Sequence, residues 1–166
     1  MYLGNIQFDL ATVEDLKAME TIRRKAFQPI FASFRKILGD TIYETAQLPE
    51  DLAQEGLLKS YFNEDSFWKT WKVLLESKII AFVAIRLDKQ AEVGEIGLNA
   101  VDPDFSGQGI GTEIYHFAVR EMKKAGMKVA TLATGGDPSH LPARKAYQKA
   151  GFTVQIPSVW MCQELE

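Results

Sequence analysis

The chain contains very little cysteine: Cys162 is the only one among its 166 residues. A single cysteine cannot form a disulfide within the chain, and disulfides are the usual support of secreted proteins too small to build a large core. The shortage therefore favours a reducing compartment, and we predict a cytoplasmic location.

Long apolar runs and an excess of positive charge are also missing. No stretch approaches the roughly 20 apolar residues that a membrane-spanning helix needs, and residues 1–12 lack the basic-then-apolar pattern of a signal peptide. The formal net charge is −3, whereas nucleic-acid-binding proteins usually carry a basic face. We therefore expect neither a membrane nor a nucleic acid as a partner.

Nothing in the sequence divides the chain into parts. Internal repeats, low-complexity segments and linkers rich in Pro, Gly or Ser are absent. The chain is 46% hydrophobic and 25% charged, which is ordinary for a globular protein. We predict a single domain spanning residues 1–166.

Hydrophobic periodicity predicts alternating strands and helices. Thr12, with Asp15 three residues on, is typical of a helix-capping box, and Pro29 is expected to break the first helix. Gly39 is expected to end the second. The predicted strands are 6–10, 67–75, 79–87, 92–101, 128–134, 152–155 and 159–165, and the predicted helices are 12–26, 30–38, 50–61, 110–125 and 139–150. This order indicates an α/β protein with a mixed sheet and helices packed on it.

A glycine-spaced loop follows the predicted strand 92–101 and leads directly into a helix. Glycine allows sharp backbone turns and leaves no Cβ in the way of a ligand. The free N–H groups of the loop and of the first helical turn then converge, and the helix dipole adds positive potential, so the loop suits a phosphate. The candidate anion site comprises Ser106, Gly107, Gln108, Gly109, Ile110, Gly111 and Thr112.

Two common nucleotide-binding loops have a different spacing. A Rossmann site needs Gly-x-Gly-x-x-Gly, and a Walker loop needs Gly-Lys-Ser/Thr. Neither occurs at 106–112. Taken alone, the loop remains open to a simpler interpretation, a flexible turn that only begins a helix.

Two motifs together resemble the GNAT superfamily of N-acetyltransferases. That family has Arg/Gln-x-x-Gly-x-Gly/Ala after a strand ending in Val-x-Pro, and later Asn-x-x-Ala-x-x-x-Tyr-x-x-x-Gly-Phe. The first motif reads here Val101-Asp-Pro103 and then Ser106-Gly-Gln-Gly109-Ile-Gly111, and the second reads His140-Leu-Pro-Ala143, Tyr147 and Gly151-Phe152. The resemblance implies a central, mostly antiparallel sheet flanked by helices, acetyl-CoA as cosubstrate and no metal.

The resemblance also assigns cofactor contacts. The loop would hold the pyrophosphate, and the backbone of Asn99, Ala100 and Val101 would bind the pantetheine arm and supply an oxyanion donor. His140, which replaces the usual Asn, and Ala143 would lie beside the cofactor. Because Ser106 replaces the usual Arg or Gln, binding at the loop is expected to rest on backbone N–H groups.

Acetyl transfer to an amine needs a neutral nucleophile, a donor for the oxyanion and a proton for the leaving thiolate. Tyr147 matches the family tyrosine that donates to the sulfur, although a tyrosine packed in the core is the alternative. Glu95 is the candidate base, since strand alternation would place Glu95 and Val101 on one side. A solvated strand residue, with water as the base, remains the alternative for Glu95.

The acceptor side is less defined. Phe31 and Tyr43 fall where this family builds its acceptor pocket, and the expected acceptor is a primary amine of a small molecule or peptide. Homodimers are common in the family, so a homodimer is a further expectation. The two histidines and Cys162 show no metal-ligand spacing. Two other functions stay open: an acyl-CoA sensor of the same fold without catalysis, and a protein that binds another nucleotide or phosphate.

Overall fold

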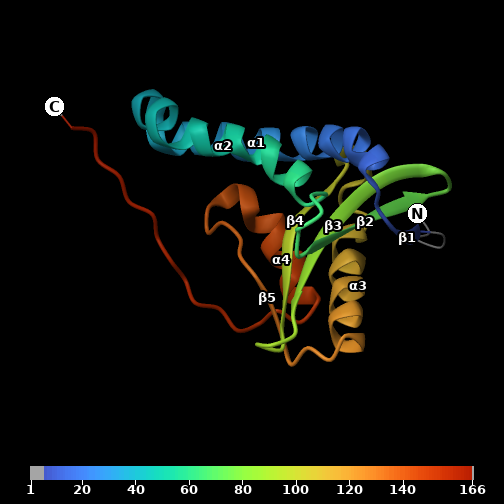
Figure 1. Cartoon of the computed structure of the whole chain (residues 1–166). Coiled ribbons are helices and arrows are strands. Elements are labelled where there is room, and N and C mark those ends of the chain that lie inside the picture. Colours follow the sequence, from blue (N-terminus) through green and yellow to red (C-terminus); the bar gives the residue numbers. More distant parts are fainter. Residues whose placement is uncertain (1–5, 166) are drawn as a thin grey trace.

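The computed structural model describes residues 6–165. Five strands form one sheet in the order β1-β2-β3-β4-β5, as Figure 1 shows. The first four pair antiparallel, and β5 lies parallel to β4. The strands are β1 (Ile6–Leu10), β2 (Trp68–Leu75), β3 (Lys78–Asp88), β4 (Val93–Val101) and β5 (Val129–Leu132). The predicted mixed sheet is confirmed.

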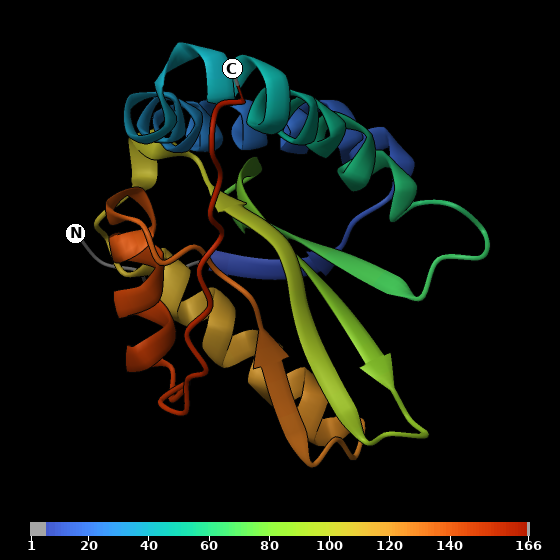
Figure 2. The ribbon, with the colours of Figure 1, turned by 90° about the vertical axis from the view of Figure 1, so that its left-hand side faces the viewer.

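Helices cover both faces of this sheet (Figures 1 and 2). One apolar cluster joins α3 and α4 to the sheet, and a second cluster joins α1 and α2 to the opposite face. The central strand β3 contributes Val83 and Ile85 to the first cluster, and Phe82 and Ala84 to the second. The main helices are α1 (Leu16–Ile42), α2 (Leu48–Ser60), α3 (Ile110–Lys124) and α4 (Leu141–Lys149), and the short turns are η1 (Val13–Asp15), η2 (Tyr43–Gln47), η3 (Pro103–Phe105) and η4 (Pro138–His140).

The capping box at the start of the chain is confirmed. The Thr12 N–H donates to Asp15 Oδ2 at 2.8 Å, and the Asp15 N–H donates to the Thr12 carbonyl at 3.0 Å. Lys72 on β2 also donates to the Asp15 carboxylate, at 2.9 and 3.0 Å. The cap therefore ties the first helical turn to the sheet.

Within residues 6–165, no helix is long and apolar enough to cross a membrane.

The predicted break at Pro29 is wrong, because α1 continues through it to Ile42. A proline inside a helix removes one hydrogen bond, that of the carbonyl four residues earlier. Pro29 and Lys25 are both exposed, so water can hydrate the carbonyl of Lys25. The helical path does break at Gly39, where φ is 76°, as the sequence predicts.

The two predicted closing strands are wrong as well. Residues 152–165 form no strand in the structure, and the end of the segment runs away from the body of the sheet (Figure 1). Phe152 still packs on the α3/α4 cluster, but the apolar side chains that follow are exposed, with Val154 and Ile156 both at 95%. Apolar alternation indicates a preference for strand geometry, but a strand forms only where another strand offers its backbone.

A bulge in β4 changes which side chains face which helices. Ile96 pairs with Ile85 and Asn99 pairs with Val83, so β4 uses one residue more than β3 over the same span. An extra residue reverses the alternation of side chains beyond it. Before the bulge Ile96 packs in the α3 cluster, and after it Ala100 packs in the α1/α2 cluster.

Candidate active site

The glycine-spaced loop leads into α3 through two left-handed glycines and leaves the start of the helix uncapped. Gly107 and Gly109 have φ values of 74° and 84°, a region that side chains disfavour. Gly109 is the N-cap of α3, and no side chain caps the helix there. The first N–H groups of a helix have no partner within it, so those of Ile110, Gly111 and Thr112 are free to bind an anion.

The strand that leads into this loop has a free edge beside it. β4 pairs with β5 only from Val93 to Ile96, opposite Val129 to Leu132. Beyond Ile96, the stretch 97–101 does not pair with β5, and its residues 99–101 pair with β3 on the other side. The three residues expected to bind pantetheine, Asn99, Ala100 and Val101, all lie in this stretch. An extended ligand can add to such an edge as a further strand would.

Three side chains meet beside this edge and form a directed hydrogen-bond network. The Tyr115 hydroxyl of α3 donates to Asn99 Oδ1 at 2.9 Å, and Asn99 Nδ2 donates to the Tyr147 hydroxyl oxygen of α4 at 3.3 Å. The two tyrosine rings lie 4.3 Å apart between centroids. Tyr147 thus accepts from Asn99, and its hydroxyl lies beside that of Tyr115.

Tyr115 was missed by the sequence interpretation, although a signal for it was present. It lies three residues before Ala118 and seven before Met122, on the face of α3 that packs on the sheet. Burial, together with the neighbouring Tyr147 hydroxyl, raises the pKa of Tyr115 well above its ordinary value. The raised pKa favours the protonated form of Tyr115, in which its hydroxyl donates to Asn99.

Glu95 does not share a face with Val101, so the strand-alternation argument for it is wrong. Val101 packs in the α3 cluster, whereas Glu95 precedes the bulge and lies on the α1/α2 side. Burial raises the pKa of Tyr61 of that cluster, and the nearby Glu95 carboxylate raises it further. Arg86, opposite Glu95 on β3, forms an ion pair with its carboxylate. The Glu95 carboxylate is thus held in an ion pair with Arg86, and it faces away from Tyr147.

His140 and Ala143 lie where β5 connects to α4. Ala143 packs in the α3/α4 cluster. His140 ends η4 and stacks its ring on Phe34 of α1, with 5.8 Å between centroids. Its Nδ1 lies 2.5 Å from Oδ1 of Asp137, a residue that the sequence interpretation did not single out, although it stands three residues before His140 at the cap of η4.

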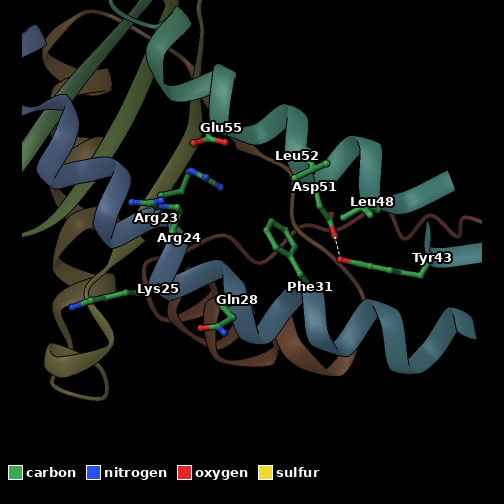
Figure 3. Close-up of a pocket in the computed structure, with 10 residues that line it drawn as sticks. All are labelled: Arg23, Arg24, Lys25, Gln28, Phe31, Tyr43, Leu48, Asp51, Leu52 and Glu55. Atoms are coloured by element: carbon green, nitrogen blue, oxygen red, sulfur yellow. Dashed lines mark hydrogen bonds between the residues drawn. The ribbon is translucent and has the colours of Figure 1, made fainter. Parts of the chain in front are cut away.

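A cavity of about 500 Å³ lies between α1 and α2 (Figure 3). Phe31 and Tyr43, the two residues expected in an acceptor pocket, both line it, and the Tyr43 hydroxyl donates to the buried Asp51 carboxylate at 2.9 Å. The lining is charged: Arg23, Arg24, Lys25, Asp51 and Glu55. Neither Tyr147 nor the loop lines this cavity. Among residues 6–165, no group of three or more His, Cys, Asp or Glu side chains is placed to hold a metal ion.

Comparison with known proteins gives a family match over most of the chain. The model of the acetyltransferase (GNAT) family matches residues 27–152. An uncharacterised N-acetyltransferase of Bacillus subtilis, YsnE, is 28% identical over 63% of this chain and 66% of its own length. A mycothiol acetyltransferase of Saccharomonospora viridis is 26% identical over 66% of this chain and 37% of its own length. The matched part of the chain thus spans between about a third and two thirds of these relatives.

Solved structures share the fold at low identity. PaiA N-acetyltransferase of Thermoplasma acidophilum, solved with coenzyme A, matches with a TM-score of 0.71 and 19% identity over 93% of both chains. AAC(6')-Iy, solved with a bisubstrate analogue of CoA and acetylneamine, matches with a TM-score of 0.62 and 12% identity over 98% of this chain and all of the other. With the family match over residues 27–152, these likenesses lead to one conclusion: the chain belongs to the GNAT family of acetyltransferases.

Proposed function

We propose that this chain transfers an acetyl group from acetyl-CoA to a primary amine by direct attack of the amine on the thioester. The observation that carries the proposal is the Tyr147 hydroxyl beside the free edge of β4. Asn99 donates to this hydroxyl, so the proton of the Tyr147 hydroxyl can go to a thiolate that leaves along that edge.

The cofactor would bind mainly through backbone groups. Its pyrophosphate would sit over the N–H groups of Ile110, Gly111 and Thr112, where the dipole of α3 adds positive potential. Its pantetheine arm would run along residues 97–101 as an added strand. Ser106 brings no charge to the loop, so affinity at the pyrophosphate depends on the shape of the loop.

The chemistry needs little more than positioning and proton transfer. The amine lone pair attacks the carbonyl carbon, the carbon–sulfur bond breaks, and the Tyr147 proton passes to sulfur. A backbone N–H of residues 99–101 would stabilise the oxyanion. Glu95 remains a prediction as the base, and its ion pair with Arg86 would have to open before its carboxylate could accept a proton.

The cavity between α1 and α2 is the proposed entry for the acceptor. Its volume of about 500 Å³ falls within the range of small-molecule sites. The Asp51 and Glu55 carboxylates would attract an ammonium group and lie beside the cationic side chains of residues 23–25, and Phe31 supplies an apolar wall. This favours a small amine or the amine of a short peptide, in keeping with the aminoglycoside derivative in the solved relative.

Two measurements test the proposal in sequence. Saturating acetyl-CoA should raise the melting temperature, since a ligand at about 100 times its Kd adds roughly 2.7 kcal/mol of stability. Release of free thiol should then depend on an added amine from a panel of small amines and peptides. A rise in melting temperature with acetyl-CoA but no amine-dependent thiol release would indicate the non-catalytic acyl-CoA sensor instead. A rise with ATP or NAD but not with CoA would contradict both the acetyltransferase and the sensor.

Assembly and location remain predictions. The homodimer is tested by light scattering after size-exclusion chromatography, where the monomer mass is 18.7 kDa. The cytoplasmic location is tested by fractionation of cells that express the chain at its native level.

A further inference from the structure

A carboxylate and an imidazole form a tightly held pair at the turn before α4. Asp137 Oδ1 lies 2.5 Å from His140 Nδ1. The other oxygen, Oδ2, accepts the Ser139 N–H at 2.9 Å and also the Ser139 hydroxyl. Burial alone would raise the pKa of Asp137, but the hydrogen bonds from Ser139 and His140 outweigh it and hold that pKa below its ordinary value. The carboxylate is therefore ionised at neutral pH.

The surrounding chain holds this pair in one arrangement. Arg144 of α4 donates to the carbonyl oxygens of Gly135 and Asp137, at 2.6 and 2.7 Å. Gly135 leaves room for the pair, because a Cβ at that position would lie 2.4 Å from His140 Nδ1. Phe34 of α1 covers the imidazole ring. Held from the loop, from α4 and from α1, the ring has little freedom to rotate.

The arrangement determines which ring nitrogen is free. Because Nδ1 is used in donating to the carboxylate, the neutral ring carries no proton on Nε2, and that atom is an acceptor. Nε2 has no hydrogen-bond partner among residues 6–165. An imidazole held by a carboxylate with its second nitrogen free is the arrangement of a general base.

The pair stands at the start of α4, the helix that carries Tyr147. His140 is the N-cap of this helix, and Tyr147 lies seven residues further along, about 10 Å at the helical rise. Tyr147 reaches Asn99 on β4, while His140 reaches Phe34 on α1. Phe34 is one helical turn beyond Phe31, which lines the cavity. His140 thus lies between the helix that carries Tyr147 and the helix that lines the cavity.

We propose that His140, positioned by Asp137, is the general base of acetyl transfer, in place of Glu95. This inference rests on the proposed acetyltransferase function. As the amine nitrogen bonds to the thioester carbon, Nε2 takes the proton that the nitrogen must lose. The carbon–sulfur bond breaks, the thiolate takes the Tyr147 proton, and the imidazolium gives its proton to water while water reprotonates the phenolate. The products are the acetylated amine and free CoA.

The decisive variant is His140→Asn, because asparagine is the residue that the family usually has at this position. It keeps a polar side chain for contact with the cofactor and removes the base. We expect kcat for amine-dependent thiol release to fall about 100-fold, with KM for acetyl-CoA unchanged. His116→Asn is the matched control: His116 lies on α3, where it pairs with Glu113, and its replacement should leave kcat unchanged.

Two further variants separate the base role from a structural one. Asp137→Asn should lower kcat less than His140→Asn and leave KM for acetyl-CoA unchanged, because the imidazole remains but loses its orientation. His140→Ala should regain part of its rate when free imidazole is added, which a packing defect would not do.

Full kcat in His140→Asn, or a rise in KM for acetyl-CoA without a loss of kcat, would overturn the proposal and leave the proposed function standing. A larger loss of kcat in Glu95→Gln than in His140→Asn would return the base role to Glu95. A wild-type chain that binds CoA but releases no thiol with any amine would remove the proposed function, and this inference with it.

Discussion

Asn99 on β4 and Tyr147 on α4 are joined by a hydrogen bond of 3.3 Å from the Asn99 amide to the Tyr147 hydroxyl oxygen. The direction of this bond matters more than its length. Tyr147 accepts in this bond, so under the proposed function its own proton would go to the ligand. The bond also links the strand expected to bind pantetheine with the helix that carries the second family motif.

Removing the Tyr147 hydroxyl should impair chemistry more than binding. In Tyr147→Phe we expect kcat for thiol release to fall about 100-fold, the lower end of the usual contribution of a positioned acid. The ring still packs against Tyr115, so the variant should fold and still show a thermal shift with CoA. An unchanged kcat would mean that Tyr147 is a core tyrosine and that sulfur leaves without its proton.

A side chain at Gly109 should weaken cofactor binding. Gly109 has a φ of 84° at the N-cap of α3, where a Cβ costs roughly 1–2 kcal/mol. The substitution Gly109→Ala should lower stability by that amount and also raise Kd for CoA, as measured by calorimetric titration.

Gly126 provides the matched control for this experiment. It follows the other end of α3 with a φ of 82°, and a Cβ there would meet nothing within 4 Å. Gly126→Ala should carry the same loss of stability without any change in Kd for CoA. Equal effects of the two variants on Kd would show that the loop does not contact the cofactor.

A side chain at Gly97 should disturb the β4 bulge. A Cβ at Gly97 would lie 2.3 Å from the Trp68 ring, which is too close for any side chain. Gly97→Ala should cost about 1–3 kcal/mol of unfolding free energy, as overpacking usually does. Gly56→Ala on α2, where a Cβ meets nothing within 4 Å, should instead leave stability equal or higher. Denaturant unfolding of the two variants checks both expectations.

Stability should depend on pH through Asp15. Burial acts to raise the pKa of Asp15, but the hydrogen bonds from the Thr12 N–H and from Lys72 outweigh it and leave that pKa below 3.8. A carboxyl group whose pKa is lower in the folded state stabilises the fold above its unfolded pKa, and this contribution is lost as pH falls through the folded pKa.

The corresponding variant is Asp15→Asn. It should cost about 1 kcal/mol at pH 7, as the loss of a helix cap does, and the difference from wild type should shrink below pH 3.8. Thermal unfolding of both proteins from pH 7 to below pH 3.8 measures this difference in stability. A difference that stays constant with pH would show that the charge of Asp15 plays no part.

Local patterns predicted much of this fold because they report on local physics. The helix start at Thr12, the break at Gly39 and the open turn at Gly107 and Gly109 each follow from the conformations that those residue types favour. The order of elements followed from periodicity in the same way. Pro29 shows the limit, because an exposed carbonyl can be hydrated and the helix then continues.

The parts that were wrong or missed depend on contacts between distant segments. The β4 bulge moves Glu95 to the opposite face from Val101, and strand alternation has no signal for an inserted residue. Tyr115 and Asp137 become hydrogen-bond partners of Asn99 and His140 only in the folded chain, and neither residue type signals such a bond in the sequence. Residues 152–165 have the pattern of strands, but no neighbouring strand pairs with them.

Binding of acetyl-CoA by the loop 106–112 and the free edge of β4 underlies the whole proposed mechanism. Calorimetric titration of the wild-type chain with CoA tests this binding most directly, with ATP and NAD as comparison ligands. We expect one CoA bound per chain, with ATP and NAD binding far more weakly. A folded chain that takes up no CoA at millimolar concentration would contradict it.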